Sequence, residues 1–334
     1  MLWKAERIVA RRQISTKGNV TACRLRERSF EITGSLSFLG LPEFLPGDSS
    51  PRVVIFGVGY GSTYRGKDSS GYASASDAIR TASQEDAPLV DHWDFDLDGP
   101  LFDGNPVCCI DAGNIPTIMH DNAGNRAQIE AKTRDILTLP AVPVLLGGDD
   151  SVPIPFIAGF ADHGPLWVMQ IDAHIDWRDE LHGERYGYSS PMRRVSEMPH
   201  IDGIVQVGMR SVGSARVNEM EAARDFGSRI ITAREVHAHG VEVALRHIPE
   251  GARVVITLDC DGLDPSIMPA VAARTPGGLT YTQVIDLIAG VGKRAKISGF
   301  DLVELHPPSD IDGLSALTAA RLVVNVIGTI VRQD

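Results

Sequence analysis

The stretch LWVMQIDAHID, from Leu166 to Asp176, joins a hydrophobic run to three closely spaced side chains that can bind metal ions. Its first six residues are almost entirely apolar, which is typical of a parallel strand covered on both faces. Asp172, His174 and Asp176 then alternate, so we expect the extended strand to continue and to turn these side chains to one side. Ligands of open parallel sheets bind beyond the carboxyl ends of the strands, so this stretch predicts a fold class and the edge where a site would lie.

Six more apolar runs, separated by helix-length segments, extend this pattern along the chain. The runs start at Arg52, Pro106, Val142, Gly203, Arg253 and Lys296, and the predicted helices cover 125–137, 233–247, 280–291 and 315–327. Because parallel strands need crossover connections, the alternation predicts an α/β fold of three layers, α/β/α, with a doubly wound, mostly parallel sheet. We see no repeat or Pro/Ser-rich linker, so residues 37–334 are expected to form one domain.

Charge excludes one class of partner. The chain has 334 residues, of which 43% are hydrophobic and 22% charged, so it can bury a large core. Its formal net charge of −11 argues against binding nucleic acid through a basic surface. Residues 1–36 stand apart as a basic arm, since positions 1–33 hold eight Lys or Arg and three Glu. This arm is either a solvated leader or a segment that docks on an acidic neighbour.

The sequence also predicts a location. No run approaches the roughly 18 apolar residues that a membrane span needs, so we expect no membrane association. Glutamates and the lack of a long apolar stretch make the arm a poor signal or transit peptide. The four cysteines show no CxxC spacing and do not suggest a disulfide framework: Cys23, Cys108, Cys109 and Cys260. These features predict a cytoplasmic protein.

Three other predicted strands also end in acidic residues. GGDDS (147–151) contains Asp149 and Asp150, TLDCDGLDP (257–265) contains Asp259 and Asp261, and DLVELHP (301–307) contains Glu304. Burying this many carboxylates without cations would cost several kcal/mol each, so a metal cluster is the simplest arrangement. A mixture of carboxylate and imidazole ligands suits Mn, Zn, Ni or Fe.

Each motif taken alone has a simpler interpretation. Asp-x-His-x-Asp could be an exposed strand end, and Gly-Leu-Asp-Pro could be a turn in which Asp264 binds backbone amides. Cys260 alternates away from the aspartates on either side, and we expect it to pack rather than bind metal. The joint position of the motifs at strand ends of one sheet favours a metal site.

The motifs GGDDS, DAHID and TLDCDGLDP resemble the three signature segments of the arginase/agmatinase (ureohydrolase) family, and FDLVELHP resembles its fourth acid-bearing segment. The resemblance extends from about Ser37 to the C-terminus and implies an arginase-like fold with two divalent metal ions per chain, Mn or Ni. The resemblance implies three pairs of ligands. Asp172 and Asp259 would bridge the two ions, His174 and Asp261 would complete the coordination of one ion, and Asp176 and Asp150 would complete the coordination of the other.

Asp150 departs from the family's pattern, which usually has histidine at this position. A carboxylate there keeps a ligand but adds negative charge, which could change the preferred metal or the acidity of water at the site. The alternative is a site with one weakened metal position. Asp149 would lie behind the ligands and orient them.

The resemblance also implies an activity. Two cations would activate water, Glu304 matches the carboxylate that faces the substrate guanidinium, and His182 matches the histidine that carries a proton to the departing amine. The simpler alternatives are a surface-loop histidine at His182 and a structural ion pair at Glu304. The predicted reaction is agmatinase-like hydrolysis of a C–N bond in a small cationic guanidino compound, releasing urea and an amine.

Substrate identity stays open because three loops depart from the family's pattern: 57–80, 182–191 and 269–278. Arg274, in the loop PAVAARTPGG, could pair with the carboxylate of a guanidino acid. Alternatively, Trp177, Tyr186 and Tyr188 could line a smaller pocket for a guanidine or a biguanide such as dimethylbiguanide, with nickel as the metal.

Two other classes of function remain open, and so does the assembly. The chain could be a catalytically weak subunit that supports an active paralogue in a hetero-oligomer. It could also be a zinc amide hydrolase of the related deacetylase architecture, with a single ion. Members of the family are usually trimers or hexamers, so the resemblance implies a homo-oligomer.

Overall fold

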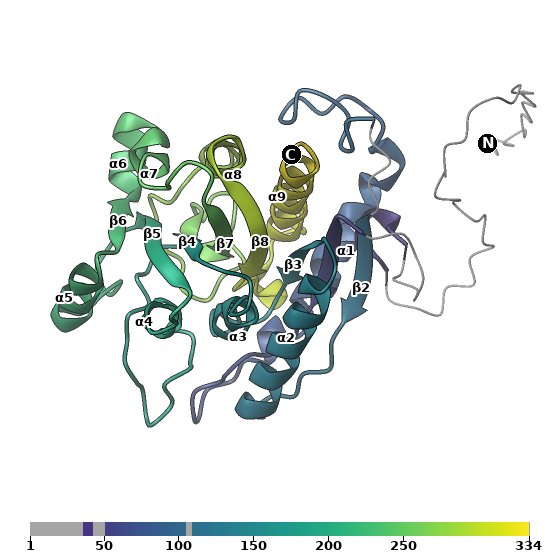
Figure 1. Cartoon of the computed structure of the whole chain (residues 1–334). Coiled ribbons are helices and arrows are strands. Elements are labelled where there is room, and N and C mark those ends of the chain that lie inside the picture. Colours follow the sequence, from purple (N-terminus) through teal and green to yellow (C-terminus); the bar gives the residue numbers. More distant parts are fainter. Residues whose placement is uncertain (1–35, 43–50, 105–108, 334) are drawn as a thin grey trace, which may run out of the picture.

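The computed structural model describes residues 36–42, 51–104 and 109–333 of the chain. Its centre is an eight-stranded sheet in which neighbouring strands pair in parallel, in the order β2-β1-β3-β8-β7-β4-β5-β6 (Figure 1). The strands are β1 Val53–Gly57, β2 Cys109–Asn114, β3 Val142–Leu146, β4 Leu166–Ile171, β5 Ile201–Met209, β6 Arg229–Thr232, β7 Arg253–Asp259 and β8 Lys296–Val303. The predicted doubly wound, mostly parallel sheet is confirmed, and among the described residues it is parallel throughout.

Two helical layers cover the sheet (Figure 1). Side chains alternate along the strands, so Ile55 packs on one face while Val54 and Phe56 pack on the other. The Ile55 face is covered by α1, α6, α7, α8 and α9, and the Phe56 face by α2, α3, α4 and α5. The helices are α1 Ala75–Ala82, α2 Asn122–Leu137, α3 Pro153–Ala158, α4 Pro191–Ser196, α5 Val217–Phe226, α6 Ala233–His239, α7 Glu242–Leu245, α8 Tyr281–Arg294 and α9 Leu314–Val331. This is the predicted three-layer arrangement.

Some elements differ from the prediction. Strand β6 and helices α1, α3, α4 and α5 were not predicted, because each is short and its pattern alone is ambiguous. The predicted helix 233–247 divides into α6 and α7 at Gly240, whose φ of 76° ends the first helix.

The end of β4 contradicts the expected extension of this strand through Asp176. The segment from Asp172 leaves the sheet, and Asp176 has a φ of 50°. Asp172 N–H still donates to the carbonyl oxygen of Val207 in β5 at 2.9 Å. The next two amides bind carboxylates: Ala173 N–H donates to Asp261 Oδ1 at 3.1 Å, and His174 N–H donates to Asp172 Oδ1 at 2.6 Å. The expected strand alternation is therefore wrong, and a bend brings the three side chains to the site.

Helix α9 is long and apolar enough to cross a membrane, with a mean hydropathy of 1.8 over 18 residues. This finding corrects the expectation that no run reaches such a length. In the fold, 78% of the helix is buried, and it packs against α1, α8 and β8 (Figure 1). That burial is typical of the core helix of a globular domain.

Part of the predicted organisation lies outside the described residues. This applies to positions 1–35 of the basic arm and to Cys23 and Cys108, so the boundary between arm and domain stays a prediction. Cys260 is fully buried in the core of the Ile55 face, as predicted.

Candidate metal centre and substrate cavity

The four strands predicted to end in acids are consecutive in the sheet, in the order β3-β8-β7-β4. Asp149 and Asp150 follow β3, Glu304 follows β8, Asp259 ends β7, and Asp172 follows β4. Parallel strands have their carboxyl ends at the same edge, so acids that are far apart in sequence lie side by side. The topology thus concentrates negative charge at the centre of one edge.

Sharp backbone turns aim these acids. Gly147 has a φ of 92°, and a Cβ there would lie 2.7 Å from the carbonyl oxygen of Val58, so the turn before Asp149 requires glycine. Asp176 and Glu304 have φ values of 50° and 63°, although neither is glycine. Such conformations are uncommon and gather at functional sites. Both side chains line a cavity at this edge.

Two groups of candidate ligand atoms lie at the cavity, which is lined by all of their residues except the fully buried Asp172. One comprises Asp172, His174 and Asp261, the other Asp150, Asp172 and Asp176, and the atoms of each group lie within 4.8 Å of one another. His174 Nδ1 is 3.1 Å from Asp261 Oδ2 and 3.4 Å from Asp172 Oδ1. Because Asp172 belongs to both groups, the geometry offers two adjacent sites with a shared carboxylate.

Asp259 lines the same cavity but belongs to neither group. Its Oδ1 accepts a hydrogen bond from the backbone N–H of Asp261 at 2.7 Å. The side chain that the resemblance assigns to a bridging position therefore lies at the cavity, where it fixes the turn that carries Asp261.

The electrostatics of the site call for cations. Burial raises the pKa of Asp150, Asp172 and Asp259 well above the ordinary aspartate value, and the neighbouring carboxylates raise it further. For His174, burial opposes the charged ring, but the hydrogen bond and charge of Asp261 raise the pKa to about 9. Among the described residues, Asp150 Oδ2 is buried without a hydrogen-bond partner. Crowded carboxylates, an imidazole and an unpartnered oxygen fit a pair of divalent metal ions.

Glu304 faces this cavity, whose volume is about 380 Å³, with both carboxylate oxygens held. Oε1 accepts the backbone N–H of Asp150 at 2.9 Å, and Oε2 accepts the Tyr72 hydroxyl at 2.5 Å. Burial, and after it the charge of Asp149, raises the pKa of Glu304 to about 8. A cationic group placed beside this fixed carboxylate would favour its ionised form.

The three loops that depart from the family's pattern all reach the cavity. Tyr72, Tyr188 and Ala273 come from different loops and line it together. Trp177 also lines the cavity, but its side chain is 2% exposed and its Nε1–H donates to Gln206 Oε1 at 2.9 Å. Of Trp177 and Tyr188, the two predicted aromatic residues that line the cavity, Tyr188 is therefore the more accessible.

Three predicted residues lie outside the cavity lining. His182 is exposed in a turn, with a φ of 55°. Arg274 is exposed, and its Nε–H donates to the carbonyl oxygen of Pro269 at 2.6 Å, so the guanidinium holds its own loop instead of facing the site. Tyr186 lies on the surface with the Arg126 guanidinium 4.4 Å from its ring centre. The structure does not bring these three side chains together with the acids.

Two other predicted acids hold the backbone. Asp149 Oδ1 accepts the Ser151 N–H at 3.1 Å and its Oδ2 accepts the Ser69 hydroxyl at 3.3 Å, so Asp149 fixes the turn that presents Asp150. Asp264 accepts three backbone N–H groups, including that of Gly277 at 2.8 Å, which confirms the turn interpretation. Burial opposes its ionisation, but these bonds lower the pKa of Asp264 to about 2.

Sequence reasoning missed two side chains that hold the acids. Tyr72 binds Glu304, and Gln170 donates to both Asp172 and Asp176. A polar residue inside the apolar run of β4 was the available signal for Gln170. Tyr72 belongs to a segment that departs from the family's pattern, but its contact depends on how that loop folds.

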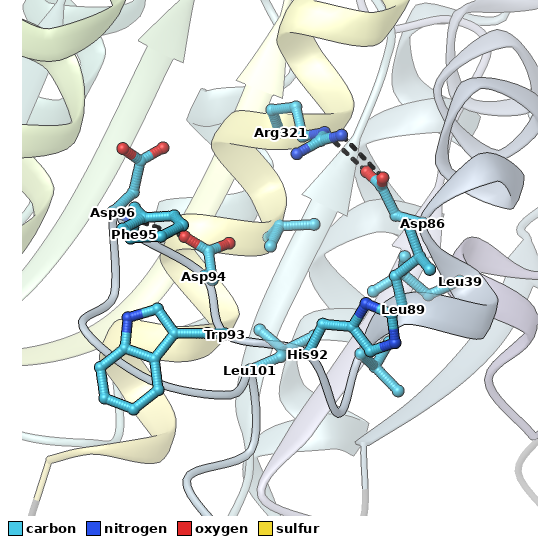
Figure 2. A pocket seen from close by; sticks show the side chains of 12 residues that line it. Leu39, Asp86, Leu89, His92, Trp93, Asp94, Phe95, Asp96, Leu101 and Arg321 are labelled. Carbon is cyan, nitrogen blue, oxygen red and sulfur yellow. Dashed lines mark hydrogen bonds and ion pairs between the residues drawn. The ribbon is translucent and has the colours of Figure 1, made fainter.

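A second hollow, of about 370 Å³, lies between α9 and the segment from Asp86 to Leu101 (Figure 2). Trp93 and Phe95 are 58% and 90% exposed there. Asp86 is already paired with Arg321, with 2.6 Å between Oδ2 and Nε. The groups of described residues that could hold a metal ion lie at the other cavity.

The sheet, and the carboxylate and imidazole groups at its edge, define an α/β protein with a candidate site for two divalent metal ions. The model of the Arginase family matches residues 51–328. The chain therefore belongs to the arginase family, which confirms the resemblance seen in the sequence.

Individual relatives agree with this membership. The chain is 37% identical over 188 residues to N(1)-aminopropylagmatine ureohydrolase from Thermus thermophilus. The aligned stretch covers 55% of this chain and 61% of that protein. It is 31% identical over 295 residues to proclavaminate amidinohydrolase from Streptomyces clavuligerus, which covers 84% of this chain and 90% of that protein. The structure of the latter superposes with a TM-score of 0.77 over 90% of this chain and 98% of that chain, at 28% identity. A hypothetical agmatinase from Burkholderia thailandensis gives a TM-score of 0.74 over 89% and 91%, at 26% identity.

Proposed function

We propose that this chain is a ureohydrolase that cleaves a C–N bond of a cationic guanidino compound and releases urea and an amine, using two divalent ions, Mn or Ni. One observation carries the proposal: two groups of ligand atoms share the buried Asp172, and their four other residues line one cavity together with Glu304. A single-ion amide hydrolase would leave the group that contains Asp150 and Asp176 without a role.

The proposed ligand set follows from this geometry. Asp172 is shared by both sites, and Asp259 lines the same cavity. One residue pair completes each site: His174 with Asp261, and Asp150 with Asp176. When bound, the ions would supply the Lewis acidity that makes water a nucleophile near neutral pH.

Glu304 would bind and orient the substrate. A guanidinium carbon is a poor electrophile because three nitrogens share its positive charge, so alignment matters. Charge-assisted hydrogen bonds to a carboxylate hold the planar cation in one orientation. The Asp150 N–H and the Tyr72 hydroxyl fix the two oxygens of Glu304, so the carboxylate does not need to reorganise when substrate arrives.

Departure of the amine needs a proton, and we keep His182 as the proposed carrier. An imidazole can both accept and donate a proton near neutral pH, which suits proton transfer in both directions. His182 is outside the cavity lining, but Tyr188 and Ser189 of the same loop border the cavity. The role therefore requires a rotation of the loop that turns the imidazole inward.

The agmatinase-like substrate class is the main proposal, and a compact guanidine or biguanide is the second candidate. The second is favoured by Tyr72, Trp177 and Tyr188, three aromatic residues that line the cavity together with Glu304. A guanidino acid would not meet Arg274. Lys67 is the lining cation that could reach its carboxylate, since Arg178 is paired with Glu219 at 3.4 Å.

A catalytically weak subunit is less consistent with the structure. The ligand atoms of Asp150, Asp172 and Asp176 lie within 4.8 Å of one another. The change from the usual histidine to Asp150 therefore leaves a complete group of donors. A supporting role would also require a partner chain for activity. The homo-oligomeric assembly, as a trimer or hexamer, and the cytoplasmic location remain predictions.

The direct test is a screen for urea release by the purified chain, loaded with Mn or Ni. The compounds are agmatine, arginine, guanidino acids, guanidine and biguanides, and metal content is measured on the same samples. We expect two ions per chain and urea from at least one compound. Two ions without urea from any compound would contradict the activity, and fewer than two would contradict the metal centre.

Asp176→Ala should abolish urea release and remove one of the two ions. Asp162→Ala is the matched control, because Asp162 is an exposed aspartate that does not line the cavity. Retained turnover in Asp176→Ala would refute the ligand assignment.

A further inference from the structure

Two buried amide side chains lie directly behind the carboxylates. Gln170 in β4 pairs with Gln206 in β5, and the two residues are 1% and 0% exposed. Gln170 Nε2 lies 2.7 Å from Asp172 Oδ2 and 2.7 Å from Asp176 Oδ2. The two N–H groups of one amide are therefore divided between two carboxylates of the same ligand group.

Partners that can only donate or only accept fix the direction of Gln206. The Trp177 indole N–H only donates, and it lies 2.9 Å from Gln206 Oε1. The carbonyl oxygen of Ile175 only accepts, and it lies 2.8 Å from Gln206 Nε2. The second hydrogen of that nitrogen goes to Gln170 Oε1. Because its oxygen is engaged in this way, Gln170 must turn its nitrogen toward the acids.

Asp172 and Asp176 are buried and belong to one ligand group, so their charges repel when no ion lies between them. A fixed amide that donates to both sets their spacing before any ion arrives. We propose that Gln170, oriented by Gln206 and Trp177, is a positioning residue that holds Asp172 and Asp176 in place for one of the two metal ions. This inference rests on the proposed metal centre, and it gives the nearly inaccessible Trp177 a role other than substrate contact.

The first test replaces the amide. Gln170→Leu keeps a side chain of similar size but removes both donors, and the metal-free protein is titrated with Mn²⁺ by calorimetry. Wild-type protein should bind two ions and give the electron paramagnetic resonance spectrum of a coupled pair. The variant should bind one ion about 10-fold to 100-fold more weakly, as for lost partners of metal ligands. The other ion should be affected less, because only Asp172 among its ligands loses a donor. Its spectrum should be that of isolated Mn²⁺.

Two further variants separate positioning from general disruption. Gln206→Glu presents a carboxylate that cannot donate to Gln170 or Ile175, so it should reproduce the loss of one ion. It also replaces Gln170→Leu if that variant does not fold. Ser228→Ala is the matched control: the Ser228 hydroxyl lies 2.8 Å from Gln206 Oε1 but can either donate or accept, so its removal should leave both affinities unchanged.

Wild-type affinity for both ions in Gln170→Leu and Gln206→Glu would overturn the inference and leave the proposed function standing. Equal weakening of both ions, together with a changed circular dichroism spectrum, would also overturn it, because the residues would then be merely structural. If wild-type protein itself bound fewer than two ions, the proposed metal centre and this inference would both fall.

Discussion

Replacing Asp301 by asparagine is expected to stabilise the protein at neutral pH. Asp301 lies in β8 between β3 and β7 and is fully buried. Its Oδ1 accepts the Thr257 hydroxyl at 2.8 Å, while Oδ2 has no hydrogen-bond partner among the described residues. Burial raises the pKa of Asp301 to about 8, so the folded protein keeps this carboxyl protonated at pH 7.

The magnitude follows from the two pKa values. In the unfolded chain the carboxyl would ionise near its ordinary value of 3.8. Because the folded pKa is the higher one, the contribution of this carboxyl to the free energy of unfolding is fully present below pH 3.8 and is lost as pH rises toward 8. At about 1.4 kcal/mol per pH unit, proton uptake costs about 4 kcal/mol of the free energy of unfolding at pH 7. Asparagine has nearly the shape of the protonated acid, keeps an oxygen for Thr257 and does not ionise.

Urea denaturation of wild type and Asp301→Asn between pH 4 and 8, with a metal chelator throughout, measures this effect without ion binding. The difference in the free energy of unfolding should be near zero at pH 4 and reach about 4 kcal/mol at pH 7. Asp202→Asn, at an exposed position of β5, should show a difference that does not change with pH. A flat difference for Asp301→Asn, or a less stable variant at pH 7, would mean that the native carboxyl is ionised and would refute the reasoning.

Three other predictions concern stability. Asp111 is 1% exposed and lies 2.7 Å from Arg80 Nε. Arg80→Met would leave it as an unpaired buried charge and should lower the free energy of unfolding in urea by about 3–5 kcal/mol. A loss below about 1 kcal/mol would contradict this. Chelation of divalent ions should lower the melting temperature in differential scanning fluorimetry, and Mn²⁺ at 100 times its dissociation constant should restore about 2.7 kcal/mol of stability for each site that it fills; a metal-independent melting temperature would count against the centre. Asp264→Asn should lower the melting temperature at pH 7, and the effect should shrink as pH falls from 3.8 toward 2, because the low pKa of Asp264 stabilises the fold only while it is ionised; an equal effect at both ends of that range would exclude a charge-assisted origin.

The sequence predicted the central strands because a parallel strand covered on both faces is a continuous apolar run. All seven predicted runs correspond to strands, from the run at Arg52, which is β1, to the run at Lys296, which is β8. Strand β6 escaped prediction because Arg229–Thr232 is only four residues long at the edge of the sheet. Elements of this length have too few positions for their periodicity to separate strand from turn.

The acids of the site were predictable for a related reason: their place at strand ends is a local property, and the parallel topology then brings them together. Loop side chains follow no such rule. Tyr72 and Glu304 are 232 positions apart and meet only because of how the loop that carries Tyr72 folds. Arg274 was expected to face substrate, but a carbonyl oxygen of its own loop binds the guanidinium. Such choices depend on the local competition between hydrogen-bond partners, which residue type does not decide.

Charge balance links Asp150 to the kind of substrate that the proposed centre would accept. The proposed ligands include five aspartates, so two divalent ions leave one negative charge, and Glu304 adds a second. A guanidinium offsets one of these charges, whereas a neutral amide offsets neither, which favours a cationic substrate over the amide alternative. The same substitution makes the group of Asp150, Asp172 and Asp176 entirely carboxylate, a donor set that suits Mn, while the group with His174 also suits Ni. Asp150 therefore biases both the metal and the substrate in directions that a histidine at this position would not.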